Sequence, residues 1–434
     1  MLLNPVFISV AVMLSLSLLK LNVIIALLVA ALVGGYLSGI GLSETMEVLV
    51  GGMNENANTA LSYILLGALA VSVQKTGLIN IFSRNISNLF YGKKLYLVVM
   101  IALIASLSQN IFPVHIAFIP ILIPPLLSIF DNLKLDRRAV SCALTYGLKA
   151  PYVALPFGYG LIFHETIFTA LEENGLAIAL GDIPKALLLP VIGMTIGLFI
   201  AIFITYRKER DYGEPNNIGK DIEIDDTLSF NFKHAVSIIA MVSAIVTQYF
   251  TDSLPLGALF ALFIMFVGRA IKWNEINEML NSGITMMGYI AFVMLVASGY
   301  SDVLRETGGL DSLVESYVVI VGGSQAIGIF VLLIVGLFVT MGIGTSFGTV
   351  PILASLYVPF GLSLELSPMA ITALVGTAGA LGDAGSPASD STLGPTAGLS
   401  ADKKHDHIWD TCVPTFIHFN IPLMLFGWLS AMIF

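Results

Sequence analysis

Apolar stretches long enough to cross a lipid bilayer recur from one end of this chain to the other. Only 11 % of its 434 residues are Asp, Glu, Lys or Arg, against about 25 % in soluble globular domains. The mean hydropathy of +0.90 agrees with this scarcity of charge. The chain is therefore predicted to be an all-α polytopic membrane protein with roughly 11–14 membrane segments. Its net charge of -9 and the lack of a basic patch exclude nucleic acid as a partner.

The predicted segments fall into two halves. In the first half they lie at about 5–19, 22–40, 59–79, 95–112, 114–130, 138–163 and 184–206, and in the second at about 233–250, 254–269, 284–302, 325–341, 343–360, 368–392 and 410–432. The one clearly hydrophilic stretch separates them. We therefore predict an N-terminal membrane half (1–206), a hydrophilic linker (207–231) and a C-terminal membrane half (232–434).

Basic residues favour one side of the membrane. If the N-terminus lies outside, all but three of the 20 Lys and Arg residues fall on the cytoplasmic side or at its interface. The exceptions are Lys149, Lys185 and Arg305. The positive-inside rule supports this orientation. It predicts a multi-pass protein of the cell (inner, cytoplasmic) membrane whose 207–231 linker is cytoplasmic.

One constant shift in residue number relates the two halves. The shift that carries Thr76-Gly77 onto Thr307-Gly308 also carries Pro120-Ile-Leu122 onto Pro351-Ile-Leu353 and Pro156 onto Pro387. We call it the repeat offset. An odd number of membrane segments separates the matched elements, so the second copy is expected to cross the membrane in the opposite sense. Inverted-topology repeats with broken helices or re-entrant hairpins are typical of secondary transporters, whose sites lie where the broken helices meet.

Two predicted segments are interrupted at matching places in the two halves. The first interruption contains Ser108, Gln109, Asn110, Pro113 and His115. The second contains Gly342, Gly344, Thr345, Ser346 and Thr349. Freed backbone carbonyls are tolerated at membrane depth only where they are buried in protein or line a cavity. These polar groups are predicted to bind a small cation or a carboxylate; the alternative is close helix packing by small residues.

The stretch 376–392 is the most informative in the chain. It places Asp383 and Asp390 among Gly, Ser and Thr residues and the helix breaker Pro387. Carboxylates at membrane depth are costly and by default mark an ion or proton pathway. Because hard cations favour oxygen ligands, we predict a Na+ site at Asp383 and Asp390, completed by Ser386 and Ser389. The alternative for Asp390 is a helix cap at the membrane interface.

Lys149 is the one basic residue inside a predicted segment, and the helix breakers Pro151 and Pro156 follow it. The repeat offset places it opposite Ala380, three residues before Asp383. We expect Lys149 to face Asp383 across the pseudo-symmetry axis and to compete with the bound cation. The alternative is that its ammonium reaches the cytoplasmic edge of the membrane.

His115 is a second coupling candidate, since histidine titrates near neutral pH; a structural role is its alternative.

Two further histidines, His405 and His407, lie in the run Lys-Lys-His-Asp-His. Their spacing is similar to that of metal ligands. The flanking charges instead predict a solvated cytoplasmic loop.

Several stretches resemble the NhaC-like Na+/H+ antiporter family of the ion transporter superfamily. They include MLLNPVFISVAVMLSLSLLK, NANTALSYILLGALAVSVQKTGL and GALGDAGSPASDSTLGPTAGLSADKKHDHIWDTCVPTFIHFNIP. The run Gly344-Thr-Ser-Phe-Gly-Thr349 is similar to the Gly-Thr-Ser-Trp-Gly-Thr of better known members, with Phe347 in place of Trp. The resemblance covers essentially the whole chain and points to a branch of Na+-coupled amino-acid or cation transporters. It implies a scaffold domain, a mobile transport domain and elevator-like alternating access, often in a homodimer.

The leading hypothesis is a secondary active transporter that exchanges Na+ for H+ by alternating access. Na+-coupled transport of a small amino acid or organic acid is the alternative. A channel is one rival from another class, and an intramembrane hydrolase is a second. Both aspartates fall in one segment instead of on facing helices, which argues against a hydrolase. We expect no enzymatic activity and no cofactor, with Na+ or H+ as coupling ions, the lipid bilayer as surroundings and a small cation or organic solute as cargo.

Overall fold

The structure is a computed structural model that describes residues 4–78, 93–110, 118–156, 159–213, 230–251, 253–309 and 324–434. In these ranges all regular structure is helical and no strand occurs. Seven helices here are long and apolar enough to span a membrane, and five shorter helices are also apolar. The predicted all-α polytopic membrane fold is therefore confirmed.

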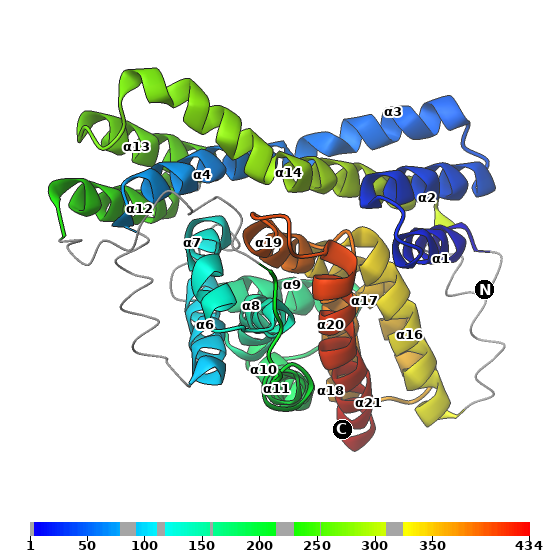
Figure 1. Cartoon of the computed structure of the whole chain (residues 1–434). Helices are drawn as coiled ribbons and strands as arrows, with labels where there is room; N and C mark the ends of the chain where they lie inside the picture. Colours follow the sequence, from blue (N-terminus) through cyan, green and yellow to red (C-terminus); the bar gives the residue numbers. More distant parts are fainter. Residues whose placement is uncertain are drawn as a thin grey trace.

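The helices form two layers (Figure 1). We call the first the α4/α14 layer, because these two helices cross at its centre. It contains α1 (Pro5–Leu18), α2 (Val23–Leu37), α3 (Leu42–Gly52), α4 (Ala57–Lys75), α12 (Phe232–Thr251), α13 (Leu254–Val267) and α14 (Ile276–Glu306).

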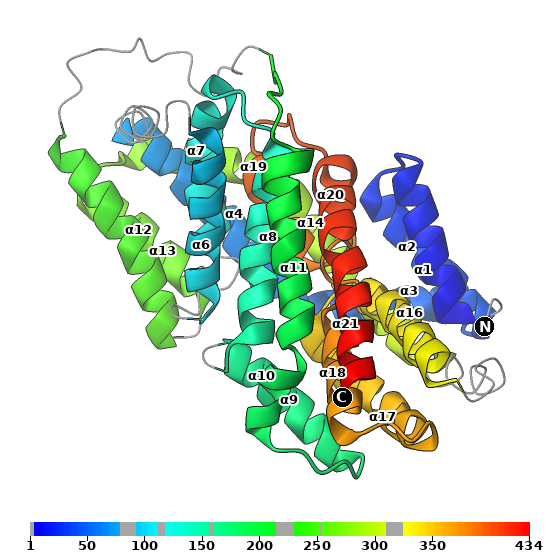
Figure 2. The ribbon, with the colours of Figure 1, turned by 90° about the horizontal axis from the view of Figure 1, so that it is seen from below.

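The second layer, which we call the α8/α18 layer, holds the other helices that the structure describes. From the first half it contains α6 (Lys94–Asn110), α7 (Phe118–Asn132), α8 (Arg137–Ala154), α9 (Tyr159–Glu173), α10 (Ile183–Ala186) and α11 (Leu188–Ile200). From the second half it contains α16 (Gln325–Ile343), α17 (Ser346–Ser363), α18 (Pro368–Ala380), α19 (Asp390–Leu399), α20 (Val413–Thr415) and α21 (Ile421–Ile433). Figure 2 shows α6, α8, α11 and α21 running side by side across this layer.

Short helical turns complete the chain. The 3-10 turns are Met53–Asn56, Leu180–Asp182 and Trp273–Glu275, and the π-helical turns are Ala201–Thr205, His407–Cys412 and Phe416–Asn420. Helix starts follow ordinary capping chemistry. Asn4 precedes Pro5 and accepts hydrogen bonds from the N–H groups of Val6 (2.9 Å) and Phe7 (3.2 Å). Ser367 precedes Pro368 and caps α18 in the same way.

Helix boundaries in the two halves follow the repeat offset. Six pairs of boundaries match to the residue. Four are helix starts, in the pairs α2 and α13, α6 and α16, α8 and α18, and α9 and α19. Two are helix ends, in the pairs α4 and α14 and α7 and α17. Left-handed backbone also recurs at this spacing, at Gly77 and Gly308 and at Lys134 and Glu365.

The repeat offset also relates two contacts at the crossing of α4 and α14. At one point a Cβ on Gly67 would lie 2.9 Å from the carbonyl oxygen of Gly283. At another, the Ser298 hydroxyl donates to the carbonyl of Gly52, at 2.9 Å. The repeat offset carries Gly67 onto Ser298 and Gly52 onto Gly283. The two contacts are therefore counterparts about one axis; the inverted orientation of the copies in the membrane stays a prediction.

One end of the molecule gathers the turns between α1 and α2 and between α7 and α8, the first linker residues (207–213) and the loop 400–406. We call it the basic end. Its anchor is Arg137, which is fully buried and donates to Asp131 (2.7 Å) and to both oxygens of Asp402 (2.7 and 2.6 Å). Tyr212 accepts a hydrogen bond from the Arg137 N–H (2.9 Å), and Arg210 pairs with Asp410 (2.6 Å). These contacts fix residues 207–213 to the α8/α18 layer.

Candidate functional site

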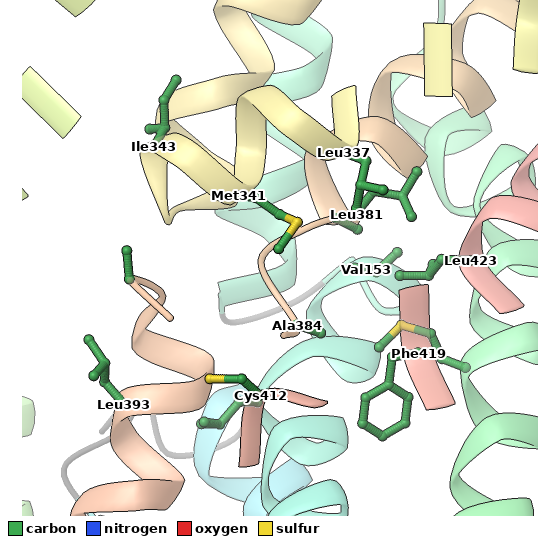
Figure 3. Packing of buried hydrophobic residues seen from close by; sticks show 14 of the residues in the cluster. Val153, Leu337, Met341, Ile343, Leu381, Ala384, Leu393, Cys412, Phe419 and Leu423 are labelled. Carbon is green, nitrogen blue, oxygen red and sulfur yellow. The ribbon is translucent and has the colours of Figure 1, made fainter. Parts of the chain in front are cut away.

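The site is built where the chain between α18 and α19, residues 381–389, runs through the interior of the α8/α18 layer. Gly382 and Gly385 have φ values of +81° and +115°, which only glycine adopts without strain. Figure 3 shows Leu381 and Ala384 between apolar side chains of α16 on one side and Phe419 and Leu423 on the other. This segment is a series of turns, and at this depth it is stable only if its backbone polar groups find partners in the protein.

Asn420 supplies two of these partners. Its Oδ1 accepts from the Gly382 N–H at 2.9 Å, and its amide donates to the Ala384 carbonyl. The Ser386 hydroxyl donates to the Met341 carbonyl at the end of α16 (2.7 Å). The break between α18 and α19 is therefore held against α16, beside the break between α16 and α17 at Gly344.

Asp383 is the charged centre of this segment and is 2 % exposed. Three serine hydroxyls point at its carboxylate. Ser346 donates to Oδ2 at 2.7 Å, Ser391 donates to Oδ1 at 3.1 Å, and Ser389 also donates to Oδ1. The donors come from the start of α17 and the start of α19, so the carboxylate joins two helix breaks.

Lys149 on α8 provides the opposite charge. Its ammonium forms an ion pair with Asp383 and donates to Tyr152 (2.8 Å) and to Ser346 (3.2 Å). Tyr152 in turn donates to Ser346 at 2.9 Å. Lys149 is 6 % exposed and Tyr152 is 2 % exposed, so both side chains are buried in protein.

The predicted residues of the second half divide into two groups. Ser346 and Ser389 contact Asp383, whereas Ser386 and Thr349 are turned to backbone carbonyls: Thr349 donates to Thr345 and Ser346, both at 3.0 Å. Thr345 precedes α17, and its side chain makes no capping hydrogen bond. Ser386, Thr345 and Thr349 therefore shape the segment around the carboxylate without pointing at it.

Asp390 lies apart from this cluster. It is the first residue of α19, next to the capping residue Ser389, and it is partly exposed. In the described part of the chain its carboxylate has no hydrogen-bond or ion-pair partner. The structure thus places Asp383, and not Asp390, inside the hydroxyl shell.

The predicted helix breakers lie at or near real breaks. Pro151 sits inside the last turn of α8, and Pro156 follows its end. Gly344 ends α16 with φ +74°, and Pro387 lies in the segment 381–389. Gly342 instead allows close packing of α16, because a Cβ there would meet Leu304 and Val10 at 2.6 and 2.8 Å.

The first-half candidates fall at the edge of the described residues. Ser108, Gln109 and Asn110 form the end of α6, and nothing is described of their side chains. Pro113 and His115 lie outside the described residues.

The prediction that His405 and His407 lie in a solvated loop is wrong. They are only 6 % and 8 % exposed. Ring nitrogens of His407 are 2.8 Å from the Thr396 hydroxyl and 2.9 Å from the Pro387 carbonyl, so this imidazole is held against the segment 381–389. Among the described residues no group of three His, Cys, Asp or Glu side chains is placed to hold a metal ion.

Three contributors were not singled out from the sequence: Tyr152, Ser391 and Asn420. Tyr152 had a usable signal, because it lies one helical turn after Lys149 and the repeat offset carries it onto Asp383. Ser391 belongs to the Ser-rich run that contains Asp390. Asn420 is an isolated amide in an apolar stretch, and its role depends on a loop that is distant in sequence.

A polytopic helical fold with a buried carboxylate–ammonium pair at the meeting point of broken helices is typical of secondary transporters. The chain belongs to the Na+/H+ antiporter family, whose model matches residues 143–428. A second model, described as a Na+-H+ antiporter family, matches residues 4–90. The chain is accordingly a membrane-embedded secondary transporter and not an enzyme.

Curated relatives span the whole chain. A membrane protein of Haemophilus influenzae is 48 % identical to this chain, and the alignment covers 100 % of each of the two chains. A membrane protein of Vibrio parahaemolyticus is 46 % identical over 99 % of this chain and 100 % of its own. "Putative amino acid transporter YuiF" of Bacillus subtilis is 45 % identical over 99 % of this chain and 100 % of its own.

Similarity to solved structures is weaker. The YdaH transporter of Alcanivorax borkumensis aligns with a TM-score of 0.41 and 13 % identity, over 91 % of this chain and 87 % of that one. MtrF of Neisseria gonorrhoeae aligns with a TM-score of 0.39 and 15 % identity, over 91 % and 83 %. Neither value is high enough to transfer a structural or functional detail to this protein.

Proposed function

We propose that the protein exchanges Na+ for H+ by alternating access, that the Asp383 carboxylate pairs in turn with Na+ and with the protonated Lys149, and that Lys149 carries the exchanged proton. The observation that carries the proposal is the buried Lys149–Asp383 pair inside a shell of serine hydroxyls. A carboxylate with hydroxyl oxygens around it is the type of ligand set that a hard cation takes.

Competition between Na+ and the Lys149 ammonium is the proposed coupling step. Na+ that enters the oxygen shell displaces Lys149 from Asp383. A buried ammonium without its counter-ion is unfavourable, so Lys149 then releases its proton. When Na+ leaves, Lys149 takes up a proton and restores the ion pair. Since Na+ and the Lys149 ammonium compete for one carboxylate, the site carries either Na+ or the exchanged proton at a time.

The resemblance implies a scaffold domain and a mobile transport domain, and we assign one layer to each. We propose the α4/α14 layer as the scaffold and the α8/α18 layer as the mobile part, because the whole charged site lies within the latter. The basic end is proposed to face the cytoplasm in the inner membrane, with the linker 207–231 on that side. Inverted repeats and a homodimer remain part of this proposal.

A second candidate is Na+-coupled transport of a small amino acid or organic acid. The similarity to the relative named as an amino acid transporter favours it. In that case Na+ would bind at Asp383 as before, but a solute would move with it in place of the returning proton.

The test uses purified protein in proteoliposomes with a pH dye inside and an inward Na+ gradient. Wild type is expected to raise the internal pH as protons leave. Asp383→Asn is expected to abolish the signal, whereas the control Asp182→Asn, which changes a carboxylate with a 34 % exposed side chain, retains it. Exchange that survives in Asp383→Asn would exclude the proposed site. A silent dye in wild type, together with Na+-driven uptake of a labelled amino acid, would establish the second candidate instead.

A further inference from the structure

The hydroxyl of Ser346 is fully occupied by hydrogen bonds in this structure. A serine hydroxyl has one hydrogen to donate and two lone pairs with which to accept. Ser346 donates its hydrogen to Asp383 Oδ2 at 2.7 Å. Its oxygen accepts from the Tyr152 hydroxyl at 2.9 Å and from the Lys149 ammonium at 3.2 Å. A cation can therefore use this oxygen as a ligand only if one of the two donors leaves it.

Ser391, on the other side of the carboxylate, differs from Ser346 in this respect. Its hydroxyl lies 3.1 Å from Asp383 Oδ1 and 2.9 Å from the Ser389 hydroxyl. Within the described part of the chain, Ser389 is the one group that could donate to the Ser391 oxygen. Ser391 therefore keeps a lone pair for a cation, whereas Ser346 does not, and the difference lies in the two donors on Ser346.

The ring of Tyr152 is held by aromatic neighbours and does not depend on its hydroxyl for its position. Its centroid lies 5.0 Å from that of Phe163 on α9 and 5.6 Å from that of Phe347 in the first turn of α17. The side chain is buried in this cluster. Phenylalanine fills the same space, so the hydroxyl can be removed while the ring packing stays.

We infer that Tyr152 is a positioning residue that lowers the affinity for Na+ by occupying the Ser346 oxygen. The inference rests on the proposed function, because it takes Asp383 as the cation site. Na+ that enters the hydroxyl shell must displace the phenol hydrogen from Ser346 to gain this oxygen as a ligand. The free energy of that hydrogen bond is lost on binding, so Na+ is held more weakly than in the same shell without the phenol.

Tyr152→Phe tests this inference by an increase in affinity. Purified full-length protein in detergent is unfolded by heat at one pH, with NaCl replacing choline chloride at constant ionic strength. The Na+ concentration at half-maximal stabilisation, which we call the Na+ midpoint, reports the affinity. It should fall about threefold to tenfold, since one hydrogen bond no longer has to be broken. The KM for Na+ in the proteoliposome assay should fall as well, which a merely structural defect would not cause.

Two further variants show whether the effect passes through Ser346. Tyr152 also accepts a hydrogen bond from Lys149, at 2.8 Å, so its loss could favour Na+ by loosening the competing ammonium. The gain from Tyr152→Phe is therefore measured again in a Ser346→Ala background, where it should shrink clearly. Tyr357→Phe is the matched control, because this buried phenol donates to the Leu332 carbonyl and does not contact the cation site. It should leave the Na+ midpoint unchanged.

Three results would overturn the inference: an unchanged Na+ midpoint in Tyr152→Phe, a higher one, which would make the phenol itself a ligand, or an undiminished gain in the Ser346→Ala background. Asp383→Asn separates this failure from that of the proposed function. A Na+ response that survives in Asp383→Asn would exclude the cation site and the inference with it. If Na+ drives no proton efflux but the shift in Tyr152→Phe is observed, only the exchange of Na+ for H+ is rejected and the role of Tyr152 stands.

Discussion

Asp383 and Lys149 hold opposite charges against each other in a place from which water is largely excluded. Taking two charges out of water costs several kcal/mol for each ion, and the ion pair offsets this only with good geometry and further hydrogen bonds. The structure supplies those bonds through three serines and Tyr152. Such a pair is a weak source of stability. It becomes useful when one partner is exchanged for a mobile cation of the same charge.

Replacing Lys149 by Met tests this exchange at the level of one residue. Without the ammonium, the Asp383 carboxylate is buried and unpaired, which costs about 3–5 kcal/mol. Na+ should then act as the substitute counter-ion and stabilise the fold by mass action. We expect Lys149→Met to unfold at a clearly lower temperature in choline chloride and to recover in NaCl, with Na+-driven proton release lost.

The double variant Lys149→Met, Asp383→Asn is the control for this experiment. With both charges removed, the unfolding temperature should no longer depend on Na+. Equal unfolding temperatures of Lys149→Met in choline chloride and NaCl would contradict competition between Lys149 and Na+.

His405 gives a prediction about acid stability. Burial lowers its pKa from 6.5 to about 3 in the folded state. Between about pH 6.5 and 3, His405 is therefore protonated in the unfolded chain and neutral in the folded protein. As a result, the free energy of unfolding falls as the pH decreases through this range. For one such group the slope approaches about 1.4 kcal/mol per pH unit. His405→Gln, which cannot take up this proton, should lose stability less steeply on acidification.

Thermal unfolding followed by fluorescence between pH 7.5 and about 4 measures this difference. Acid also protonates carboxylates in both proteins, so the informative quantity is the gap between wild type and variant at each pH. A gap that does not change with pH would show that His405 is protonated as readily in the folded protein as in the unfolded chain.

Helix packing within the α8/α18 layer depends on small residues at a few contacts. Gly197 of α11 faces the turn before α21, where a Cβ would overlap the carbonyl oxygen of His418. Gly197→Ala should force these elements apart and destabilise the protein by about 1–3 kcal/mol, as overpacking does. Gly181→Ala is the matched control, because nothing lies within 4 Å of its Cβ position. Unfolding temperatures of the two variants in the same detergent give the comparison, and equal values would contradict the proposed packing.

Most helices can be predicted from the sequence, because the Gly and Pro residues that end a helix are recognisable there. Gly344, Pro156 and the Gly-rich run before Pro387 lie at or beside breaks that the structure shows. The repeat offset predicts which helices correspond. An amphipathic helix such as α3 carries no long apolar run, so a search for membrane segments does not find it.

The candidate site was predictable only in part, for a physical reason. A carboxylate and a lysine in an apolar stretch are costly to bury, and this cost alone marks them in the sequence as candidates for a functional pair. The serines, by contrast, look alike in sequence. Ser389 and Ser391 point at Asp383, whereas Ser386 bonds a backbone carbonyl, and only the path of the loop decides between them. The burial of His405 and His407 likewise follows from the packing of α19 against the turn 407–412.

The whole molecule combines two similar halves with a site that is not symmetric. The repeat offset makes Tyr152 and Asp383 corresponding positions, and likewise Lys149 and Ala380. One half therefore supplies the ammonium and the phenol, and the other supplies the carboxylate. Because both charges sit in the α8/α18 layer, a movement of that layer as one body would carry the pair across the membrane with no net charge.

This charge balance predicts electroneutral exchange of one Na+ for one H+. The site is neutral with Lys149 protonated, and it stays neutral when Na+ replaces the proton, so the membrane potential should not drive the exchange. If one net charge moved instead, about 100 mV would contribute about 2.3 kcal/mol and shift the equilibrium Na+ gradient about fiftyfold. Proteoliposomes with a K+ diffusion potential set by valinomycin measure this directly. A shift of that size would show that a second cation moves, and the partly exposed Asp390, outside the serine shell of Asp383, is the carboxylate that we would then expect to bind it.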